Sequence, residues 1–211
     1  MQDIITFDGT AASGKGSIAK AVADYYQIKY LDTGKLYRAM AFLIIANNSD
    51  SDYKFKLKDY TQQISTDLLA NKQLDNEHIG VFASQIAQDI EVRKCLFDFQ
   101  LEFLKKNKSC VLDGRDTGSV IAPQAKFKFY IDANIKVRAQ RRYLQNQAYY
   151  TKNNVSLQDL IKKIQKRDEQ DKNRKIAPLL VPEGAIIIDN SKDILSAVIE
   201  KVIKIIDNNR N

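Results

Sequence analysis

A glycine-rich segment near the N-terminus constrains the fold most strongly. An apolar run at residues 4–7 leads into Gly-x-x-x-x-Gly-Lys at residues 9–15, and a helix-like apolar pattern follows. Glycines let the backbone turn back so that several N–H groups point at one anion, and the following helix adds its positive N-terminal end. The pattern predicts a buried strand, a phosphate-binding loop and a helix, with Lys15 as a mobile charge for the outer phosphates. An ordinary glycine-rich turn that carries a chance lysine is the alternative interpretation.

The residue after Lys15 separates classes of phosphate-binding loop. Most nucleotide-hydrolysing switches and motors place Ser or Thr directly after the lysine, where the hydroxyl holds Mg²⁺. Here Gly16 stands in that position, and the hydroxyl comes one residue later at Ser17. Gly-Lys-Gly-Ser resembles the loop of nucleoside monophosphate kinases, which implies a kinase.

The strand–turn–helix pattern recurs along the chain. Further strand-like runs precede helical patterns of 3.6-residue period, and they lie at 29–31, 109–113, 127–132 and 185–189. Five parallel strands with intervening helices predict an α/β fold with a doubly wound sheet. Between residues 79 and 104 we expect two helices, broken near 89–91.

Two stretches do not follow this pattern. Residues 47–80 start with a polar break at 47–52 and are only weakly patterned, so we expect a helical insert outside the main sheet, with a remnant of a hairpin near 68–74. Residues 147–154 are polar and aromatic and lack turn glycines, and we expect a short mobile lid there. The chain contains no internal repeat and no low-complexity linker.

Charged residues crowd the end of the run 109–113. Asp113, Arg115 and Asp116 lie within four residues. In open α/β sheets ligands bind outside the carboxyl ends of the strands, so this cluster predicts a ligand site. Asp113 is placed like the acidic residue that holds Mg²⁺, usually through water, in phosphate-loop enzymes. A simple charged turn is the alternative.

The helix after residues 127–132 carries arginines on one face. Arg138, Arg141 and Arg142 are spaced i, i+3 and i+4, which places three guanidinium groups side by side. Like charges repel, so this spacing favours a face that lies against a polyanion. A solvated basic face is the alternative.

The helix that starts at residue 157, with Ser156 as its predicted N-cap, changes character along one face. Its apolar positions are Leu157, Leu160, Ile161 and Ile164, and the same face continues with Arg167, Asp168, Asp171 and Arg174. A charge in line with a core stripe is costly unless it is paired or faces a polar ligand, so these charges predict a site. The alternative is a helix end that leaves the core for water. We expect Ala177-Pro178 to stop the helix.

Composition limits the partners. The net charge of +7 favours small polyanions over nucleic acid, because the arginines are grouped and aromatic residues are not interleaved with them. No apolar run approaches the roughly 18 residues of a membrane span, and the first strand begins at once, so we expect neither membrane insertion nor a signal peptide. Cys95 and Cys110 have no metal-ligand spacing and are expected to be buried free thiols in a reducing cytoplasm. His78, the only histidine, is expected at the surface.

Taken in order, the motifs closely resemble those of bacterial cytidylate kinases. They are the loop at 9–17, Asp32-Thr33-Gly34 with Tyr37-Arg38, Ser84-Gln85, Arg93, the turn at 113–118, and Arg167-Asp168-x-x-Asp171-x-x-Arg174 followed by Ala177-Pro178-Leu179. The resemblance spans about residues 4–189. The Asp-Gly-Arg-Asp turn and the last motif are specific to that family, whereas the phosphate loop is not. The resemblance implies a fold of the P-loop NTPase type, with helices on both faces of the sheet.

The resemblance also implies roles for the matching residues. The ATP phosphates are held by Gly9, Thr10, Ala11, Ala12, Ser13, Gly14, Lys15, Gly16 and Ser17. The acceptor phosphate is held by Thr33, Arg38 and Arg115, the cytosine edge is read by Ser84, Arg93 and Asp116 with Arg174 nearby, and the sugar hydroxyls are reached by Arg167 and Asp171. The implied catalytic residues are Lys15, Arg115, Arg138 and Arg142, with Arg141 beside them on the donor side, and the implied Mg²⁺ ligands are Ser17 and Asp113.

The implied organisation is a single kinase unit over residues 1–211. Its core is 1–38 with 84–211, the nucleotide-monophosphate insert is about 39–83, and the lid is about 146–156. Three positions depart from the family pattern. Ala12 stands where the family usually has Gly, Thr33 replaces the usual Ser and keeps the hydroxyl, and the insert is shorter than usual for bacterial members.

The function implied is phosphoryl transfer from ATP to CMP or dCMP, with Mg²⁺, by a cytoplasmic enzyme that is expected to be a monomer without nucleic-acid or membrane partners. One alternative is another kinase of this fold that uses UMP, AMP or a sugar-like acceptor, which a panel of acceptors distinguishes. Another is a non-enzymatic nucleotide- or RNA-binding module, which would bind RNA with a steep salt dependence and release no acceptor-dependent ADP. The acidic residues Asp113, Asp116 and Asp171 argue against this module because they repel a polyanionic backbone.

Overall fold

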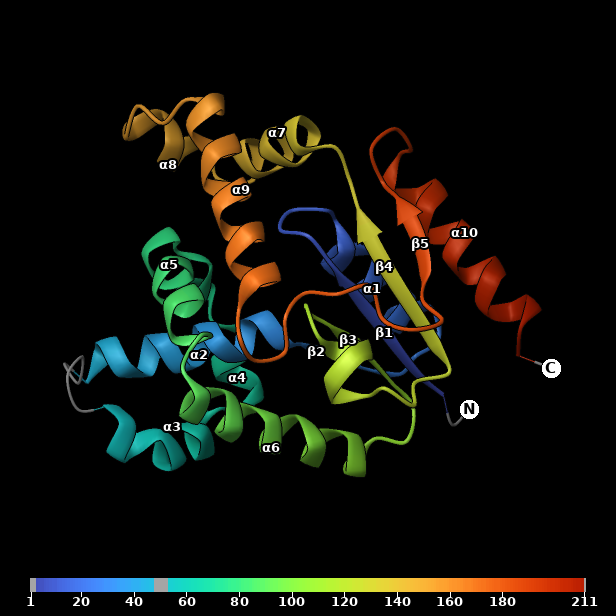
Figure 1. Ribbon diagram of the computed structural model, residues 1–211, viewed down its shortest axis with the longest axis horizontal. Helices are drawn as coiled ribbons and strands as arrows, with labels where there is room; N and C mark the ends of the chain where they lie inside the picture. Colours follow the sequence, from blue (N-terminus) through green and yellow to red (C-terminus); the bar gives the residue numbers. More distant parts are fainter. Residues whose placement is uncertain (1–2, 48–52, 211) are drawn as a thin grey trace. The chain divides into compact units, whose positions relative to one another are not determined.

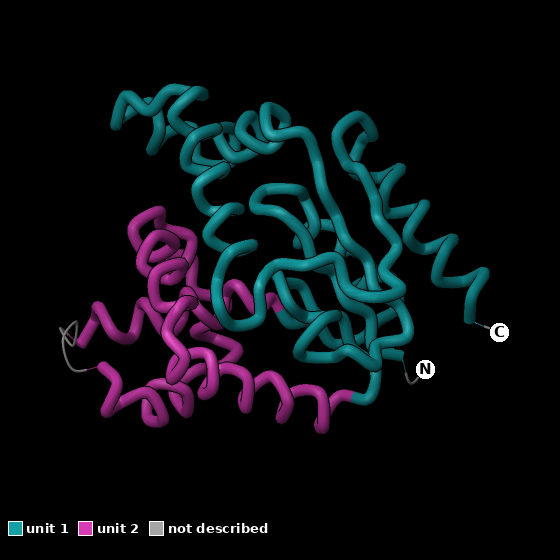
Figure 2. The backbone as a smooth tube through the Cα atoms, in the orientation of Figure 1, with its two compact units in different colours: residues 1–31, 108–211 teal, residues 32–107 magenta. Residues whose placement is uncertain are grey.

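The computed structural model describes residues 3–47 and 53–210. The chain forms two compact units, residues 1–31 with 108–211 and residues 32–107 (Figure 2). Most of the polar break predicted at 47–52 lies outside the described residues.

The first unit contains the five-stranded sheet predicted from the sequence (Figure 1). The strands are β1 (Ile4–Gly9), β2 (Lys29–Asp32), β3 (Cys110–Asp113), β4 (Phe127–Asp132) and β5 (Ile186–Asp189), and their order is β2-β3-β1-β4-β5. β1 lies parallel to β3 on one side and to β4 on the other. The chain leaves β1 toward the β2 side and later crosses to β4, so the end of β1 lies at a topological switch point, where α/β sheets bind ligands.

Two amphipathic helices pack on this sheet. They are α1 (Lys15–Tyr25) and α10 (Leu195–Asn208), and their apolar faces share one core with the side chains of β1, β3, β4 and β5. The buried positions Ile18 and Val22 of α1, and Val198 and Val202 of α10, repeat at helical spacing, as the sequence pattern predicted. This core anchors the phosphate loop at both of its ends.

A second apolar cluster holds three further helices next to that loop. These are α7 (Ile135–Gln145), α8 (Gln147–Lys152) and α9 (Leu157–Asn173). Tyr150 of α8 is fully buried in this cluster, which also contains Leu160 and Ile164 of α9 and Ala11 of the loop. Figure 1 shows the three helices beyond the end toward which β4 points. The stretch predicted to be a lid therefore contains a short helix with a buried anchor, and its role as a lid stays a prediction.

The ends of α9 follow from local chemistry. Ser156 caps its N-terminus as predicted, in a reciprocal capping box with Asp159. The helix ends at Asn173, earlier than the Ala177-Pro178 stop that the sequence predicted. Arg174 has an extended backbone, and its Nε donates a hydrogen bond to the carbonyl of Ala177.

The second unit is helical. Its elements are α2 (Thr33–Ala46), the 3₁₀ turn η1 (Tyr53–Lys56), α3 (Leu57–Gln63), α4 (Thr66–Ala70), the 3₁₀ turn η2 (Lys72–Asp75), α5 (Glu77–Ile86) and α6 (Ile90–Lys106). The predicted break between two helices near 89–91 is confirmed, since Asp89 caps α6 by accepting from the N–H of Glu91. The hairpin remnant predicted near 68–74 is wrong. Ser65 and Asn71 accept hydrogen bonds from the backbone of Leu68 and Gln73, and these caps start helical turns instead.

Other sequence expectations concern single residues. His78 is exposed, as expected. Cys95 and Cys110 are both free thiols, but only Cys110 is buried, and this burial raises its pKa to about 11. Over residues 3–47 and 53–210, no helix has the length and apolar character that crossing a bilayer requires.

Candidate active site

The phosphate loop follows β1, and its glycines fit their surroundings closely. Gly9 has a φ of 148°, and a Cβ built there would lie 1.9 Å from the carbonyl oxygen of Ile131 in β4. Gly14 has a φ of 91°, and its Cβ would lie 2.6 Å from Nδ2 of Asn190. Ala12 also has a positive φ, 59°, without being glycine. A non-glycine residue in this conformation costs about 1–2 kcal/mol, so the loop stores strain at Ala12.

Side chains at the ends of β4 and β5 hold the loop. Thr10 Oγ1 donates a hydrogen bond of 2.6 Å to Asp132 Oδ1. The carbonyl of Ser13 accepts from Asn190 Nδ2 at 2.7 Å and from Arg141 Nη1 at 3.4 Å. Sequence reasoning gave no role to Asp132 or Asn190, although each stands at the end of an apolar strand, where site residues are expected.

A buried ion pair holds the loop from the other side. Asp168 of α9 accepts from the N–H of Ala11 at 2.9 Å, and Arg138 of α7 donates to the carbonyl of Ala11 at 3.0 Å. Arg138 and Asp168 also pair with each other. Because Arg138 and Arg141 both contact the loop, the solvated basic face considered for this helix is wrong for these two residues. The third arginine, Arg142, donates to the hydroxyl of Tyr150 at 3.2 Å.

The acid at the end of β3 lies next to the loop lysine. Asp113 Oδ1 is 3.8 Å from Lys15 Nζ, and Asp113 Oδ2 accepts from the hydroxyl of Tyr30 at 3.3 Å. Ser17 lies two residues after Lys15 in the first turn of α1 and is exposed. Carboxylate and hydroxyl oxygens are ligands that Mg²⁺ prefers, and it is usually held by one or two carboxylates together with substrate phosphates. Residues 3–47 and 53–210 contain no group of three or more His, Cys, Asp or Glu side chains that could hold a metal alone. Asp113 and Ser17 carry oxygen ligands of this type, and their assignment to Mg²⁺ stays a prediction.

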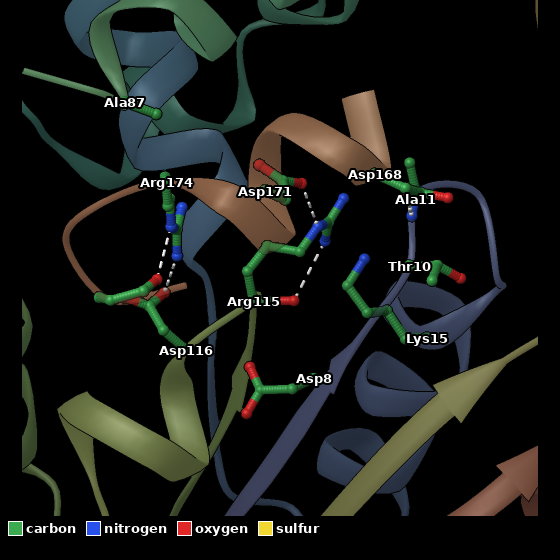
Figure 3. A network of polar contacts seen from close by, with 12 residues as sticks. Asp8, Thr10, Ala11, Lys15, Ala87, Arg115, Asp116, Asp168, Asp171 and Arg174 are labelled. Atoms are coloured by element: carbon green, nitrogen blue, oxygen red, sulfur yellow. Dashed lines mark hydrogen bonds and ion pairs between the residues drawn. The ribbon is translucent and has the colours of Figure 1, made fainter. Parts of the chain in front are cut away.

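Two further arginine–carboxylate pairs lie in the same unit (Figure 3). Arg115 Nε donates to Asp171 Oδ2 at 2.9 Å, and Arg174 Nη2 lies 3.4 Å from Asp116 Oδ1. Figure 3 shows Lys15 extending from the loop toward Arg115. α9 and the turn after β3 thus place positively charged guanidinium groups and negatively charged carboxylates beside the phosphate loop.

The electrostatics of this cluster favour its charged forms. Burial by itself raises the pKa of Asp171, but the guanidinium groups of Arg115, Arg167 and Arg174 outweigh burial and hold that pKa below its usual value. Burial lowers the pKa of Arg115, and the carboxylates of Asp171 and Asp113 more than reverse this effect. Both shifts favour the charged forms of the Arg115–Asp171 pair at neutral pH.

Asp8, a carboxylate to which the sequence assigned no role, ties the turn after β3 to β1. Asp8 is fully buried and accepts hydrogen bonds from the N–H and Oγ1 of Thr117 and from the N–H of Gly118, at 2.7–2.9 Å. Burial raises the pKa of Asp8 despite these hydrogen bonds. The turn that carries Arg115 and Asp116 is thereby tied to the strand that enters the phosphate loop. The available signal was an acidic residue inside an apolar strand.

The remaining predicted site residues lie in the second unit. Thr33 is buried at the start of α2, and Ser84 lies on α5, half-buried. Arg93 of α6 is buried, with its guanidinium 5.8 Å from the ring centroid of Tyr37. These residues are all carried by helices that pack against α2 or belong to it.

The position of Arg38 depends on a glycine that sequence reasoning missed. Arg38 Nη1 donates to the carbonyls of Leu74 and Asn76, and a Cβ at Gly80 of α5 would lie 2.5 Å from Arg38 Nη2. Ser84 follows Gly80 by one helical turn and therefore shares the α5 face that meets Arg38. Arg38 and Ser84 are thus brought to the same helix pair.

Comparison with known proteins identifies the family. The family model for cytidylate kinase matches residues 5–208. The chain belongs to the cytidylate kinase family. Cytidylate kinase from Rickettsia africae is 38% identical to it over 204 residues, which cover 97% of this chain and 91% of that protein. Cytidylate kinase from Caulobacter sp. strain K31 is 35% identical over 210 residues, which cover all of this chain and 96% of that protein.

Solved structures agree with the fold of this family. Shikimate kinase from Bacteroides thetaiotaomicron matches with a TM-score of 0.56 at 11% identity, over 97% of this chain and 98% of that one. A gluconokinase from Sinorhizobium meliloti matches with a TM-score of 0.52 at 13% identity, over 98% and 95%. At such identities the likeness concerns the fold alone, which is that of the P-loop kinases, as the phosphate loop predicted.

Proposed function

We propose that the protein transfers the terminal phosphoryl group of ATP to CMP or dCMP, giving ADP and CDP or dCDP. The observation that carries this proposal is the Arg115–Asp171 pair beside Lys15 of the phosphate loop, together with the Arg174–Asp116 pair in the same unit. Phosphoryl transfer needs a charge-neutralising site next to a phosphate loop, because it depends on positioning and electrostatic stabilisation. Membership of the cytidylate kinase family supports CMP or dCMP as the acceptor.

On the donor side, the backbone N–H groups of residues 9–17 hold the ATP phosphates, and Lys15 reaches the outer ones. Asp113 and Ser17 would hold Mg²⁺, which when bound neutralises part of the phosphate charge. Arg138 and Arg142 stay assigned to the catalytic set by family resemblance, with Arg141 beside them. Arg138 contacts the backbone of the phosphate loop at Ala11.

On the acceptor side, Thr33, Arg38 and Arg115 are assigned to the phosphate, and Arg167 and Asp171 to the sugar hydroxyls. The base is assigned to Ser84, Arg93 and Asp116, with Arg174 holding Asp116. Cytosine offers an amino donor and two acceptors, N3 and O2. A carboxylate or hydroxyl accepts from the amino group while a guanidinium donates to the acceptors.

The same arrangement would reject uracil. Uracil has a carbonyl in place of the amino group and an N–H in place of the N3 acceptor, so two buried groups would face like partners. An unsatisfied buried polar group costs about 1–3 kcal/mol, and two of them discriminate strongly. No general base is required for the transfer, although Asp113 or Asp116 is available to assist.

Exclusion of water is the remaining requirement, because water competes with CMP for the phosphoryl group. We propose that the insert, about residues 39–83, and the lid, about 146–156, close on substrate binding in an induced fit. We also propose that the enzyme works as a monomer in the cytoplasm, without nucleic-acid or membrane partners. The free thiols of Cys95 and Cys110 agree with a reducing compartment.

Acceptor-dependent ADP release tests this function. With ATP and Mg²⁺ present, ADP formation should rise when CMP or dCMP is added and should stay at background when neither is present. RNA binding is measured in parallel over a range of salt concentrations. Steeply salt-dependent RNA binding without acceptor-dependent ADP release would show a binding module instead of a kinase.

A further inference from the structure

The buried ion pair of Arg138 and Asp168 contacts the backbone of Ala11, and the proposed function gives these contacts no role. We propose that these two residues are positioning residues that clamp the phosphate loop at Ala11 and so set its conformation for ATP. The proposal rests on the proposed function only in taking ATP as the ligand of the loop.

Both polar groups of one backbone residue are held by the same ion pair. The N–H of Ala11 donates to Asp168 Oδ1, and the carbonyl of Ala11 accepts from Arg138 Nη1. Arg138 Nη1 also contacts Asp168 Oδ2, which closes a ring of three contacts. Arg138 and Asp168 are only 7% and 6% exposed, so solvent competes little for these hydrogen bonds.

The clamp is anchored to the scaffold on both sides. Arg138 Nε donates to the carbonyl of Ala133 at 2.8 Å, in the link between β4 and α7. Asp168 lies on α9, one turn after the buried Ile164. The loop therefore takes its position at Ala11 from two helices that themselves pack on each other.

The clamp acts on the strained residue that follows. The carbonyl of Ala11 belongs to the peptide plane that joins Ala11 to Ala12, and this plane is rigid. Holding that carbonyl fixes the peptide plane from which φ of Ala12 is measured. Ala12 has a φ of 59°, a value that glycine adopts without strain. A different φ at Ala12 would turn the backbone N–H groups of the residues that follow and so change the loop that is assigned to the ATP phosphates. The pair thus offsets the absence of glycine at position 12.

This role differs from the one that the resemblance implies for Arg138. Its Nε and Nη1 are directed at backbone carbonyls and a carboxylate of the protein. Arg138 would then influence phosphoryl transfer through the loop, and a loss of Arg138 or of Asp168 should produce the same defect.

The first test is nucleotide binding by calorimetry, with ATP and CMP titrated separately. Asp168→Asn keeps the shape of the side chain and removes its charge, and Arg138→Lys keeps the charge and removes the planar fork. For both variants we expect ATP to bind about 10-fold or more weakly and CMP to bind within about twofold of wild type. Glu169→Gln, an exposed carboxylate on the same helix, is the matched control and should change neither. Thermal unfolding confirms that each variant is folded at the assay temperature.

The second test asks whether the clamp acts through Ala12. Glycine adopts a positive φ without strain, so Ala12→Gly should reduce the need for the clamp. We expect the ATP defect of Asp168→Asn to shrink at least threefold in the Ala12→Gly background, and the defect of Arg138→Lys to do the same. Equal defects in both backgrounds, unchanged ATP affinity in the single variants, or parallel losses of ATP and CMP affinity would overturn the proposal. Because ATP binding is read without an acceptor, the result stands apart from whether CMP is phosphorylated.

Discussion

Asp113 Oδ2 lies 2.9 Å from the point that a Cβ on Gly16 would occupy. The Asp113 side chain is short, buried and hydrogen-bonded to Tyr30, so it cannot move aside cheaply. The position after the loop lysine is therefore closed to Ser and Thr in this protein. This contact gives a physical reason for the Gly-Lys-Gly-Ser ending, in which the hydroxyl stands one residue later, at Ser17.

Gly16→Ser should damage the enzyme even though it supplies a hydroxyl at the position that nucleotide-hydrolysing switches use. The new Cβ displaces Asp113, and a misplacement of about 1 Å costs on the order of 100-fold in turnover. Steady-state kinetics with ATP and CMP measure kcat. Gly16→Ala introduces the same Cβ without the hydroxyl and should be equally impaired. If the Ser variant kept full activity while the Ala variant lost it, the steric explanation would be wrong.

Lys15→Met should abolish most of the turnover without removing CMP binding. Lys15 is assigned to the outer ATP phosphates, and the loss of one charge that stabilises the transition state costs about 10²–10³-fold. Rapid-quench or coupled assays give kcat, and calorimetry gives the dissociation constant of CMP. Lys20→Met, which removes an exposed lysine of the same helix, is the control and should leave both values unchanged. Retained turnover in Lys15→Met would refute the role of the loop.

The ion pair of Asp171 should make a predictable contribution to stability as the pH changes. Its pKa is lowered in the folded protein, so the folded state binds fewer protons than the unfolded state as the pH falls. The stabilisation is fully present above the usual aspartate pKa, near 4, and is lost only as the pH falls through the lower folded pKa. The difference in unfolding free energy between wild type and Asp171→Asn, measured with urea, should be constant from pH 5 to 8. A difference that falls steadily between pH 8 and 5 would contradict this assignment.

Gly80→Ala should weaken CMP binding from a distance. The added Cβ would lie 2.5 Å from Arg38 Nη2, so the guanidinium must move away from the carbonyls of Leu74 and Asn76. We expect the KM for CMP to rise about 10-fold while the KM for ATP changes little. Val81→Ala, at an exposed position on the same helix, is the control. An unchanged KM for CMP in Gly80→Ala would contradict the assignment of Arg38 to the acceptor site.

The periodicity of the apolar residues, and the residue types at the ends of the apolar runs, were sufficient to predict the strands and the main helices of this protein. They succeeded because β1, β3 and β4 are mostly apolar and because glycines and acidic residues mark their ends. The prediction of a hairpin near residues 68–74 was wrong because Ser65 and Asn71 cap short helical turns. The periodicity of apolar residues does not reveal such caps.

The candidate site was predictable as a set of residue types, but several partners were not. Asp168 stood out as a charge in line with an apolar stripe, yet its sequence position could not tell whether it faces a ligand or the backbone of Ala11, 157 residues away. Asp8 was hidden within a strand, and its bonds to Thr117 and Gly118 depend on how β1 meets the turn after β3. Gly80 matters only because Arg38 lies over it. Contacts between distant segments decided each of these roles.

Acceptor selectivity tests the central claim most directly. The measurement is kcat/KM for CMP and for UMP, with ATP saturating, for wild type and for Asp116→Ala and Arg93→Ala. For wild type we predict a preference for CMP of about 100-fold or more, since uracil leaves two buried groups mismatched, and a clear fall in that preference for both variants. Equal use of CMP and UMP by wild type, or full selectivity in the two variants, would contradict the account of how this site reads its nucleotide.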